Sequence, residues 1–532
     1  MSESDVAMDL ILHGGDVVNG DGVTRIRTDV GIRGDRIVAI GDLSGAGARE
    51  RCDVSGLIVC PGFVDIHAHA DLMTLAYPEA VNKIQQGITT EVVGNCGSGI
   101  APFLDSAVRE QVREAQSSID IPGLDWDWTD VDGYLDRVES VKAAVSVAVL
   151  VGHLPLRAGV VGFDQRPATS VETERMQAEL DRMLEQGAVG MSFGLMRPPS
   201  TYATPDEMVA LGSVIARHDA LMAVHMRDYG AELLAAVEEM LDVAERAGCR
   251  LQISHLCVVG EENWGLVDDA IEAIDSAADR GLDVAFDIYP YLAGSTSLSQ
   301  KAPRWAMDGG MPGFRARLAD PDTRRRIADE METGDPRWDW TLLAYVPQDD
   351  SLNGSTVEEA ASRRGVKAVD LALRLLEASD PVMVAFGRSE DDLRTVLSHP
   401  RSMIGTDGLV VLPPETSGGS LPHPRAFGAY PGFFQRYVRE QGTVSLERAV
   451  QMCTAAPASR VRLGDRGHLS EGARADVVAF DADRIAETST YTEPRRAPVG
   501  VEQVVANGVR VVADGKVTGM RGNHPVRGGS LA

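Results

Sequence analysis

The stretch CPGFVDIHAHADL, residues 60–72, places two histidines at alternate positions where a short apolar run ends. Side chains of a β-strand alternate between its two faces, so His67 and His69 would point the same way and could present two imidazoles to one ion. A His-x-His pair also arises by chance in exposed strands. The stretch therefore predicts the end of a buried strand and a candidate metal site whose remaining ligands must come from elsewhere in the chain.

The composition is that of an ordinary globular protein, with 44% hydrophobic and 24% charged residues. At 532 residues the chain is longer than one hydrophobic core usually supports, so we expect one large domain with additions or more than one domain. The formal net charge of -28 repels nucleic-acid phosphates and anionic lipid surfaces. We therefore expect neither nucleic acid nor a membrane as a partner.

The cysteines and the first residues bear on the compartment. Six cysteines are spread thinly along the chain, without the close pairing of a disulfide framework. The opening MSESDVAMDLILHGGDVV lacks a basic start followed by a long apolar core, and no later segment approaches roughly 18 uninterrupted apolar residues. These features predict a cytoplasmic protein.

The two ends of the chain share a sequence pattern of short strands separated by Gly and Asp turn residues. Residues 1–60 contain TDVGIRGDRIVAIGD, and residues 464–532 contain GHLSEGARADVVAFD before a loose tail. Chain ends commonly lie close together in folded domains. We therefore expect a small β-sandwich domain built from both termini.

The middle of the chain, residues 61–463, alternates apolar strand patterns with helical ones such as TERMQAELDRMLEQG. The eight strand candidates are GFVDIHAH, TTEVVGNC, AVSVAVLVGH, AVGMSFG, ALMAVHM, CRLQISH, DVAFDIYP and RSMIGTDG. Eight such units predict an α/β fold, a parallel TIM-like (β/α)8 barrel whose active site lies at the carboxyl ends of its strands. An insertion at about residues 293–381, before the last barrel strand, would be either a lid or wall of that site or a peripheral addition.

The residues that end the proposed strands share metal-binding chemistry. They are His67 and His69 on the first strand, Cys96 on the second, His153 on the third, His225 on the fifth, His255 on the sixth and Asp407 on the eighth. Strand ends of a barrel converge on one mouth, so these side chains would meet there. Imidazole, thiolate and carboxylate together suit zinc far better than magnesium or calcium, and they could serve two ions.

Several motifs resemble those of a known family. PGFVDIHAHADL, GITTEVVGNCGSGIAP, HMRDYG, LQISHL and MIGTDG are similar to the amidohydrolase superfamily and to its D-aminoacylase, or N-acyl-D-amino-acid deacylase, branch. The resemblance runs in order through nearly the whole chain. The Asn-Cys-Gly element at Cys96 marks the branch, because many relatives instead use a carboxylated lysine after the fourth strand, where this chain has GMSFG.

The resemblance implies two metal positions. His225, His255 and Cys96 would hold a tightly bound zinc. His67 and His69 would bind a second ion, weaker or sometimes missing, with Cys96 as the bridge. A zinc ion lowers the pKa of a bound water toward about 7 and polarises a carbonyl, which suits amide hydrolysis.

Two strand-end residues have roles other than simple ligation in this scheme. Asp407 would act as general base and later as general acid, although a plain ligand role is the alternative. His153 is a candidate substrate contact, with the alternative that it completes a hydrogen bond behind the ligands.

Recognition of a free carboxylate would need a cation, for which arginine is best suited. Arg425 in HPRAFGAYPGF resembles the family's carboxylate-binding His-Pro-Arg element, and Tyr289, Tyr291 and Ser295 resemble the accompanying hydroxyl donors. For an isolated arginine after a proline, a surface salt bridge is the alternative.

Two departures from the family pattern concern this pocket. The family commonly has a lysine two residues after the sixth-strand histidine, where this chain has Cys257, and loss of a charge from a desolvated pair can cost roughly 2 to 5 kcal/mol. Cys257 could also be an extra metal ligand. The spacer LVVLPPETSGGSLP between Asp407 and Arg425 is longer than usual and could move the arginine.

The sequence therefore predicts a zinc-dependent hydrolase of a small-molecule substrate, cleaving N-acyl-D-amino acids or close analogues. The alternatives are a hydrolase of another amide or of a cyclic amide, as in hydantoinases, a deaminase, or a scaffold that has lost its metal. The intact ligand set argues against the scaffold. The sequence predicts no oligomeric state.

Overall fold

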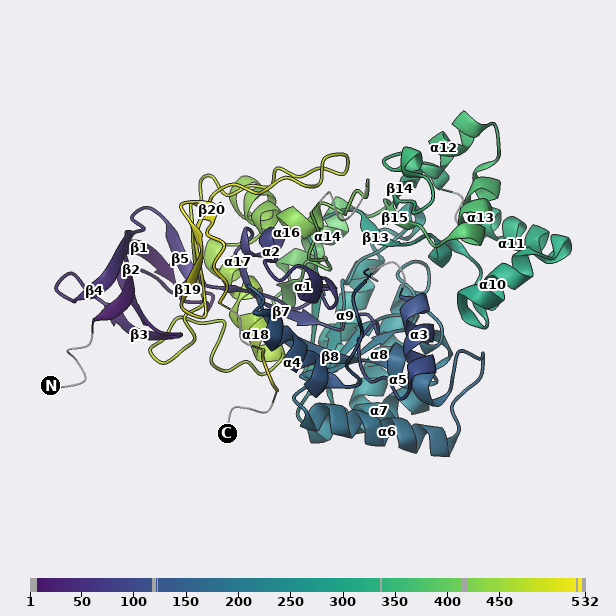
Figure 1. Cartoon of the computed structure of the whole chain (residues 1–532), viewed down its shortest axis with the longest axis horizontal. Helices are drawn as coiled ribbons and strands as arrows, with labels where there is room; N and C mark the ends of the chain where they lie inside the picture. The colour runs from purple at the N-terminus through teal and green to yellow at the C-terminus, as the bar shows by residue number, and fades with distance from the viewer. Residues whose placement is uncertain are drawn as a thin grey trace.

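An eight-stranded parallel sheet curls into a barrel at the centre of the computed structural model (Figure 1). The structure describes residues 7–116, 121, 123–334, 337–413, 419–522 and 525–528. The barrel strands are β6 (Phe63–Asp65), β7 (Ile88–Val93), β8 (Ser146–Gly152), β9 (Gly190–Gly194), β10 (Leu221–His225), β11 (Arg250–Ile253), β12 (Val284–Ile288) and β16 (Ser402–Ile404). Each of the eight predicted strands is present and pairs in parallel with its neighbours, which confirms the predicted barrel.

The two edge strands of this sheet, β6 and β16, meet just beyond their carboxyl ends. The Asp407 amide donates to the His67 carbonyl at 2.7 Å, and the His69 amide donates to the Gly408 carbonyl at 3.0 Å. These bonds join the first and eighth units of the barrel. They also fix the backbone of three predicted site residues against one another.

Helices cover the outside of the barrel, so its strands are buried on both faces; every residue of β8 is buried. The helix α8 (Leu233–Ala247) shows how the sequence dictates this packing. Its buried positions recur at the spacing of one helical face and are Leu233, Ala236, Val237, Met240, Leu241, Val243 and Ala244. The helix ends at Gly248, whose φ of 68° is readily adopted only by glycine.

The other helices of the barrel follow the same arrangement. They are α1 (Met73–Ala76), α2 (Val81–Ile84), α3 (Ser106–Ala115), α4 (Val131–Val141), α5 (His153–Val160), α6 (Ser170–Glu185), α7 (Pro205–Arg217), α9 (Leu266–Asp279), α14 (Glu390–Ser398), α16 (Arg425–Phe433), the π-helix η8 (Phe434–Glu440), α17 (Leu446–Cys453) and α18 (Ala455–Arg460). Among the helices that the model describes, none combines the length and apolar character needed to cross a bilayer.

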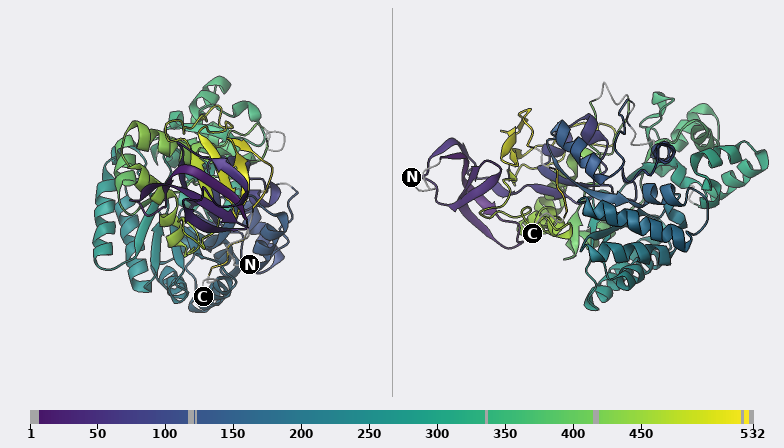
Figure 2. Two further views of the ribbon diagram at one scale, coloured as in Figure 1. Left: turned by 90° about the vertical axis from the view of Figure 1, so that its left-hand side faces the viewer. Right: turned by 60° about the horizontal axis from the view of Figure 1, so that its bottom comes forward.

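Both ends of the chain contribute to a second, nine-stranded sheet beside the barrel (Figures 1 and 2). Its strands are β1 (Met8–Val18), β2 (Arg25–Arg33), β3 (Arg36–Gly41), β4 (Ala48–Asp53), β5 (Ile58–Pro61), β17 (Val477–Phe480), β18 (Val501–Ala506), β19 (Val509–Ala513) and β20 (Lys516–Val517). The N-terminal and C-terminal parts join where β5 runs antiparallel to β17. A separate small core of side chains from both parts, including Leu12, Val30, Val59 and Val477, holds them together.

The segment between β12 and β16 forms a third unit at the opposite end of the molecule from the small sheet (Figure 1). It contains the antiparallel strands β13 (Gly294–Ser297), β14 (Thr341–Tyr345) and β15 (Val382–Ala385), and the helices α10 (Gly310–Leu318), α11 (Pro321–Gly334), α12 (Val357–Arg364) and α13 (Ala368–Ala378). It has its own buried cluster, which includes Leu298, Phe314, Leu343 and Leu376. The insertion is thus an additional folded unit on the barrel.

Candidate metal centre and substrate pocket

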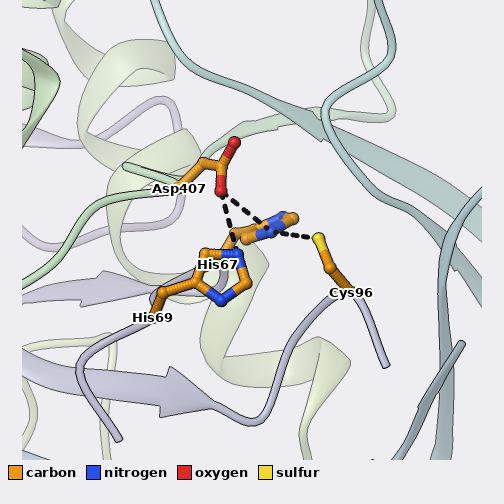
Figure 3. A group of neighbouring side chains, drawn as sticks. All are labelled: His67, His69, Cys96 and Asp407. Atoms are coloured by element: carbon orange, nitrogen blue, oxygen red, sulfur yellow. Dashed lines mark hydrogen bonds and ion pairs between the residues drawn. The ribbon is translucent and has the colours of Figure 1, made fainter. Parts of the chain in front are cut away.

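Four of the predicted ligands meet at the carboxyl end of the barrel and point toward one another (Figure 3). Potential ligand atoms of His67, His69, Cys96 and Asp407 lie within 4.8 Å of one another. The His69 Nε2 atom is 3.0 Å from Asp407 Oδ1, and His67 Nε2 is 3.2 Å from Cys96 Sγ. Residues separated by more than 300 positions in sequence are brought together because β6 and β16 are neighbours in the closed barrel.

Cys96 belongs to a second group with His225 and His255, whose potential ligand atoms also lie within 4.8 Å of one another. Its sulfur is 3.5 Å from His255 Nε2, and His225 Nε2 lies 3.1 Å from the Met196 sulfur. One thiolate is therefore common to both groups. Two clusters that share a bridging ligand are the arrangement expected for two neighbouring metal positions.

The backbone is unusual at three of these residues. Cys96, His255 and Asp407 have φ angles of 53°, 37° and 48°, in the left-handed region that residues other than glycine seldom adopt. Around Cys96 the chain packs too closely for larger residues, since a Cβ on Gly97 would lie 2.5 Å from the Gly194 amide nitrogen. Such conformations cluster at functional sites, where the surrounding structure imposes them to aim a side chain.

Asp287 holds two of the histidines in place from the end of β12. Its Oδ1 lies 2.9 Å from His67 Nδ1 and accepts the His255 amide at 2.9 Å, and its Oδ2 accepts Gln252 Nε2 at 2.9 Å. When His67 donates through Nδ1, its Nε2 is left with a lone pair for a metal. Asp287 was not identified from the sequence, although an acidic residue within the otherwise apolar VAFDI was a usable signal.

A buried ionic network lies behind the ligands and was also missed. Lys83 Nζ is 3.1 Å from Asp65 Oδ2 and 2.5 Å from Glu91 Oε1, and all three side chains are fully buried. Asp65 also accepts the Thr406 amide at 2.8 Å. The network ties α2, β6, β7 and the segment after β16 together directly beneath His67 and Asp407.

The electrostatics of the cluster favour a cation at its centre. Burial would raise the pKa of the Cys96 thiol, but the neighbouring His67 and His255 outweigh it and hold that pKa well below its usual range. For His69, burial would lower the pKa, but hydrogen bonding to Asp407 and Cys96 raises it to about 9. Anionic groups thus draw positive charge to this position, and a thiolate among imidazoles is a donor set that fits zinc.

A cavity of about 610 Å³ opens over the cluster. Barrel residues His69, Cys96, His225 and His255 line its floor, and the insertion contributes Trp340, Met383 and Phe386 to its side. The structure therefore supports the insertion as a wall of the site and not as a peripheral addition.

Arg425 reaches into this cavity from the start of α16. Its Nη1 lies 2.8 Å from Asp407 Oδ2, and its guanidinium carbon lies 4.5 Å from the centre of the Tyr289 ring. Only 5% of the residue is exposed, so the contact is not a surface salt bridge. Ser295 and Tyr289 line the same cavity, whereas residues 414–418 of the long spacer before Arg425 lie outside the described part of the chain.

Comparison with known families agrees with this geometry. A sequence model of the protein family described as "Amidohydrolase family" matches residues 50–512 of the chain. The chain belongs to the amidohydrolase family. Two curated relatives come from Alcaligenes xylosoxydans xylosoxydans. A D-aminoacylase is 34% identical over 522 residues, covering 98% of this chain and 98% of its own. An N-acyl-D-glutamate deacylase is 37% identical over 504 residues, which cover 95% of this chain and 93% of the relative.

A solved structure resembles this amidohydrolase over nearly its full length. It is an N-acyl-D-glutamate deacylase from Bordetella bronchiseptica, complexed with zinc and with a phosphonate inhibitor that mimics the tetrahedral intermediate of its reaction. It matches with a TM-score of 0.82 and 34% identity, covering 98% of this chain and 100% of that chain. The solved structure thus shares the fold of this chain, and all three matches extend over nearly its full length.

Two residues that were predicted as substrate contacts of this amidohydrolase lie outside the large cavity. His153 is fully buried, and its ring nitrogens lie 2.9 Å from Ser200 Oγ and 3.0 Å from Glu207 Oε1. The Tyr291 hydroxyl donates to Glu487 Oε1 at 2.5 Å. Neither residue is among the described residues that line the large cavity. Both side chains are therefore engaged within the protein, which for His153 agrees with the alternative role of a hydrogen bond behind the ligands.

Cys257 lines the cavity beside the cluster but belongs to neither group of candidate ligands among the described residues. Burial raises the pKa of its thiol, with Arg388 the strongest opposing influence. Arg388 itself lines the cavity and was not identified from the sequence, since nothing in the stretch VAFGRSE distinguishes it from a surface arginine.

Proposed function

We propose that this amidohydrolase cleaves the amide bond of N-acyl-D-amino acids at a zinc centre. The observation that carries the proposal is the shared thiolate of Cys96 between two ligand groups, with Asp407 and Arg425 in contact beside them. The relatives support the substrate class, because the D-aminoacylase and the two deacylases match nearly the whole chain.

The donor atoms suggest which residues would hold zinc. His225, His255 and Cys96 would bind one ion, and His67 and His69 would bind a second together with Cys96. A bound zinc supplies Lewis acidity toward the amide carbonyl and toward the attacking water. Asp287 would keep His67 in the tautomer that ligation requires.

Asp407 is suited to carry the proton from the attacking water to the leaving nitrogen. Burial would raise the pKa of its carboxyl group, but Arg425 foremost, and then His67 and His69, hold that pKa well below its usual range. Its Oδ1 faces the histidines, and its Oδ2 faces Arg425. The carboxylate is therefore ionised, oriented by Arg425 and directed at the cluster, as a general base must be.

The position of Arg425 suits an N-acyl amino acid in particular. The carboxylate of such a substrate is separated from the amide nitrogen by one carbon atom. A guanidinium that binds the carboxylate must therefore lie close to the group that protonates the nitrogen, and Arg425 touches Asp407. Arginine also matches a carboxylate with two parallel hydrogen bonds.

The compartment is proposed on separate grounds. All six cysteines are free in the structure, as expected of a protein kept in a reducing environment. We therefore propose a cytoplasmic location.

The proposed activity is tested by a hydrolysis screen of the purified, zinc-loaded protein. Paired N-acetyl-D- and N-acetyl-L-amino acids are compared with hydantoins and uncharged amides, and Asp407→Asn serves as the matched inactive control. We expect turnover of the D substrates, reduced roughly 100-fold or more by Asp407→Asn. Turnover confined to hydantoins or to the L enantiomers would contradict the proposed substrate, and release of ammonia instead of a carboxylic acid would indicate a deaminase.

A further inference from the structure

The Tyr289 ring has two arginine neighbours in the substrate cavity. The guanidinium carbon of Arg425 lies 4.5 Å from the ring centre, and that of Arg388 lies 4.8 Å from it. Arg388 follows β15 of the insertion, whereas Arg425 begins α16 after the last barrel strand. Two cations from separate parts of the fold therefore converge on one tyrosine at the wall of the cavity.

Unlike Arg425, Arg388 has no acidic partner in the part of the chain that the structure describes. Within the described residues no carboxylate forms an ion pair with it, and its Nη1 atom is buried without a hydrogen-bond partner. A guanidinium held away from water with an unmet donor is costly to the folded protein. Such a cost is recovered when an anion binds, so the unmet donor indicates an anionic ligand in this part of the cavity.

The backbone next to Arg388 is shaped to admit its guanidinium. A Cβ added to Gly294 would lie 2.7 Å from Arg388 Nη2 and 3.2 Å from the Tyr289 hydroxyl. Gly294 has no left-handed φ, so conformational freedom does not account for glycine at this position. The missing side chain leaves the space that the guanidinium occupies.

The position of Arg388 also bears on the positive charge that is missing at Cys257. Both residues line the large cavity and a small adjoining void. The family resemblance places a lysine at position 257, where this chain has a thiol. Arg388 therefore brings a positive charge to the region from which the cysteine has removed one.

We propose that Arg388 is a specificity-determining residue that binds the substrate carboxylate together with Arg425, in place of the lysine replaced by Cys257. The inference rests on the proposed function and deepens it. It assigns to this enzyme substrates with a free carboxylate next to the amide, in preference to their carboxamides or esters. Two guanidiniums can each offer a pair of donors to one carboxylate, which a single lysine cannot.

The test compares an N-acetyl-D-amino acid with its own carboxamide, in the zinc-loaded full-length enzyme. Arg388→Met keeps the length of the side chain and removes its charge. We expect kcat/KM for the carboxylate substrate to fall roughly 30-fold or more, mainly through KM, with a far smaller change for the carboxamide. Arg337→Met is the matched control, because it removes a charge from a partly exposed position on the same cavity and should change both substrates by less than about threefold.

Two further variants separate binding from a structural role. Arg388→Met combined with Cys257→Lys should recover part of the lost activity toward the carboxylate substrate, since it returns the cation to the family position. Gly294→Ala should displace the guanidinium without changing the charge, and it tests the proposal even if Arg388→Met fails to fold. Gly294→Ala should therefore also lower kcat/KM for the carboxylate substrate more than for its carboxamide.

The outcomes distinguish this inference from the proposed function. Equal losses on the two substrates in Arg388→Met and Gly294→Ala, in an active wild-type enzyme, would overturn the role of Arg388 and leave the deacylase function standing. If Arg388→Met weakens the carboxylate substrate selectively but the added Cys257→Lys restores no activity, Arg388 does not replace a lysine at position 257. A wild-type enzyme that cleaves no N-acyl-D-amino acid would overturn the proposed function and the carboxylate clamp with it.

Discussion

Replacing Lys83 by methionine should destabilise the barrel beneath the metal cluster. Lys83 is the ion-pair partner of Glu91, and both side chains have no exposed surface. Asp65 would still accept the amide and hydroxyl of Thr406, at 2.8 and 2.5 Å, whereas Glu91 has no donor other than Lys83 among the described residues. The substitution therefore leaves one buried carboxylate uncompensated, which typically costs about 3 to 5 kcal/mol of folding free energy.

The pH dependence of this effect follows from Glu91. Burial raises the pKa of Glu91 to about 6 even though Lys83 lowers it, and without Lys83 that pKa must rise further. A carboxyl group with a raised pKa costs no stability at a pH below its ordinary pKa, where it is neutral in both states, and the cost grows as the pH rises through the raised pKa of the folded protein. The stability loss of Lys83→Met should therefore be largest near pH 8 and smaller near pH 5.

Thermal unfolding followed by circular dichroism measures the effect. At pH 8 we expect Lys83→Met to lower the apparent melting temperature by about 3 to 5 °C, because the unfolding entropy of a chain of this length is large. The control is Lys83→Met combined with Glu91→Leu, which replaces the ion pair by apolar side chains and should recover most of the loss. A single variant as stable as the wild type, or a double variant no more stable than the single one, would contradict the role of Lys83 as the partner of Glu91.

Two other residues give shorter tests. Asp287→Asn should weaken zinc binding roughly 10- to 100-fold, because the amide no longer fixes the tautomer of His67; competition with a chromogenic chelator measures this, and an unchanged affinity would contradict the role. Arg425→Ala should slow both an N-acetyl-D-amino acid and its carboxamide, because Arg425 contacts Asp407, and should cost the carboxylate substrate roughly a further 30-fold in kcat/KM. Equal losses for the two substrates would remove Arg425 from carboxylate binding.

The sequence predicted the barrel because its eight strands are short apolar runs separated by amphipathic helices, and both patterns are local. The candidate ligands followed from the same reading, since the topology of a barrel brings the ends of all its strands together. The candidate ligands accordingly meet in two overlapping groups, made up of His67, His69, Cys96, His225, His255 and Asp407.

The positions of His153 and Tyr291 outside the large cavity have local causes. The strand β8 ends at Gly152 and α5 begins at His153, so the ring turns away from the mouth of the barrel to Glu207 on α7. Likewise β12 ends at Ile288, so the two-residue periodicity of a strand does not extend from Tyr289 to Tyr291. The strand predicted through His153 thus ends one residue earlier, whereas Tyr291 was predicted from the family resemblance alone.

Other site residues could not be read from local patterns at all. Asp287 is 220 positions from the His67 that it orients, and only the closed barrel brings them together. The position of Arg388 depends on how the insertion packs over the barrel. The sequence alone identified the departure at Cys257 but could not show that an arginine lies beside it.

The most direct test of the account is a zinc titration of the metal-free protein, followed by hydrolysis of one N-acetyl-D-amino acid. We predict that activity is absent without metal, that it rises with added zinc, and that Cys96→Ala, which removes the atom common to both ligand groups, abolishes both tight zinc binding and activity. Full activity in the metal-free protein, or tight zinc binding without any hydrolysis of the substrate, would contradict a zinc-dependent deacylase.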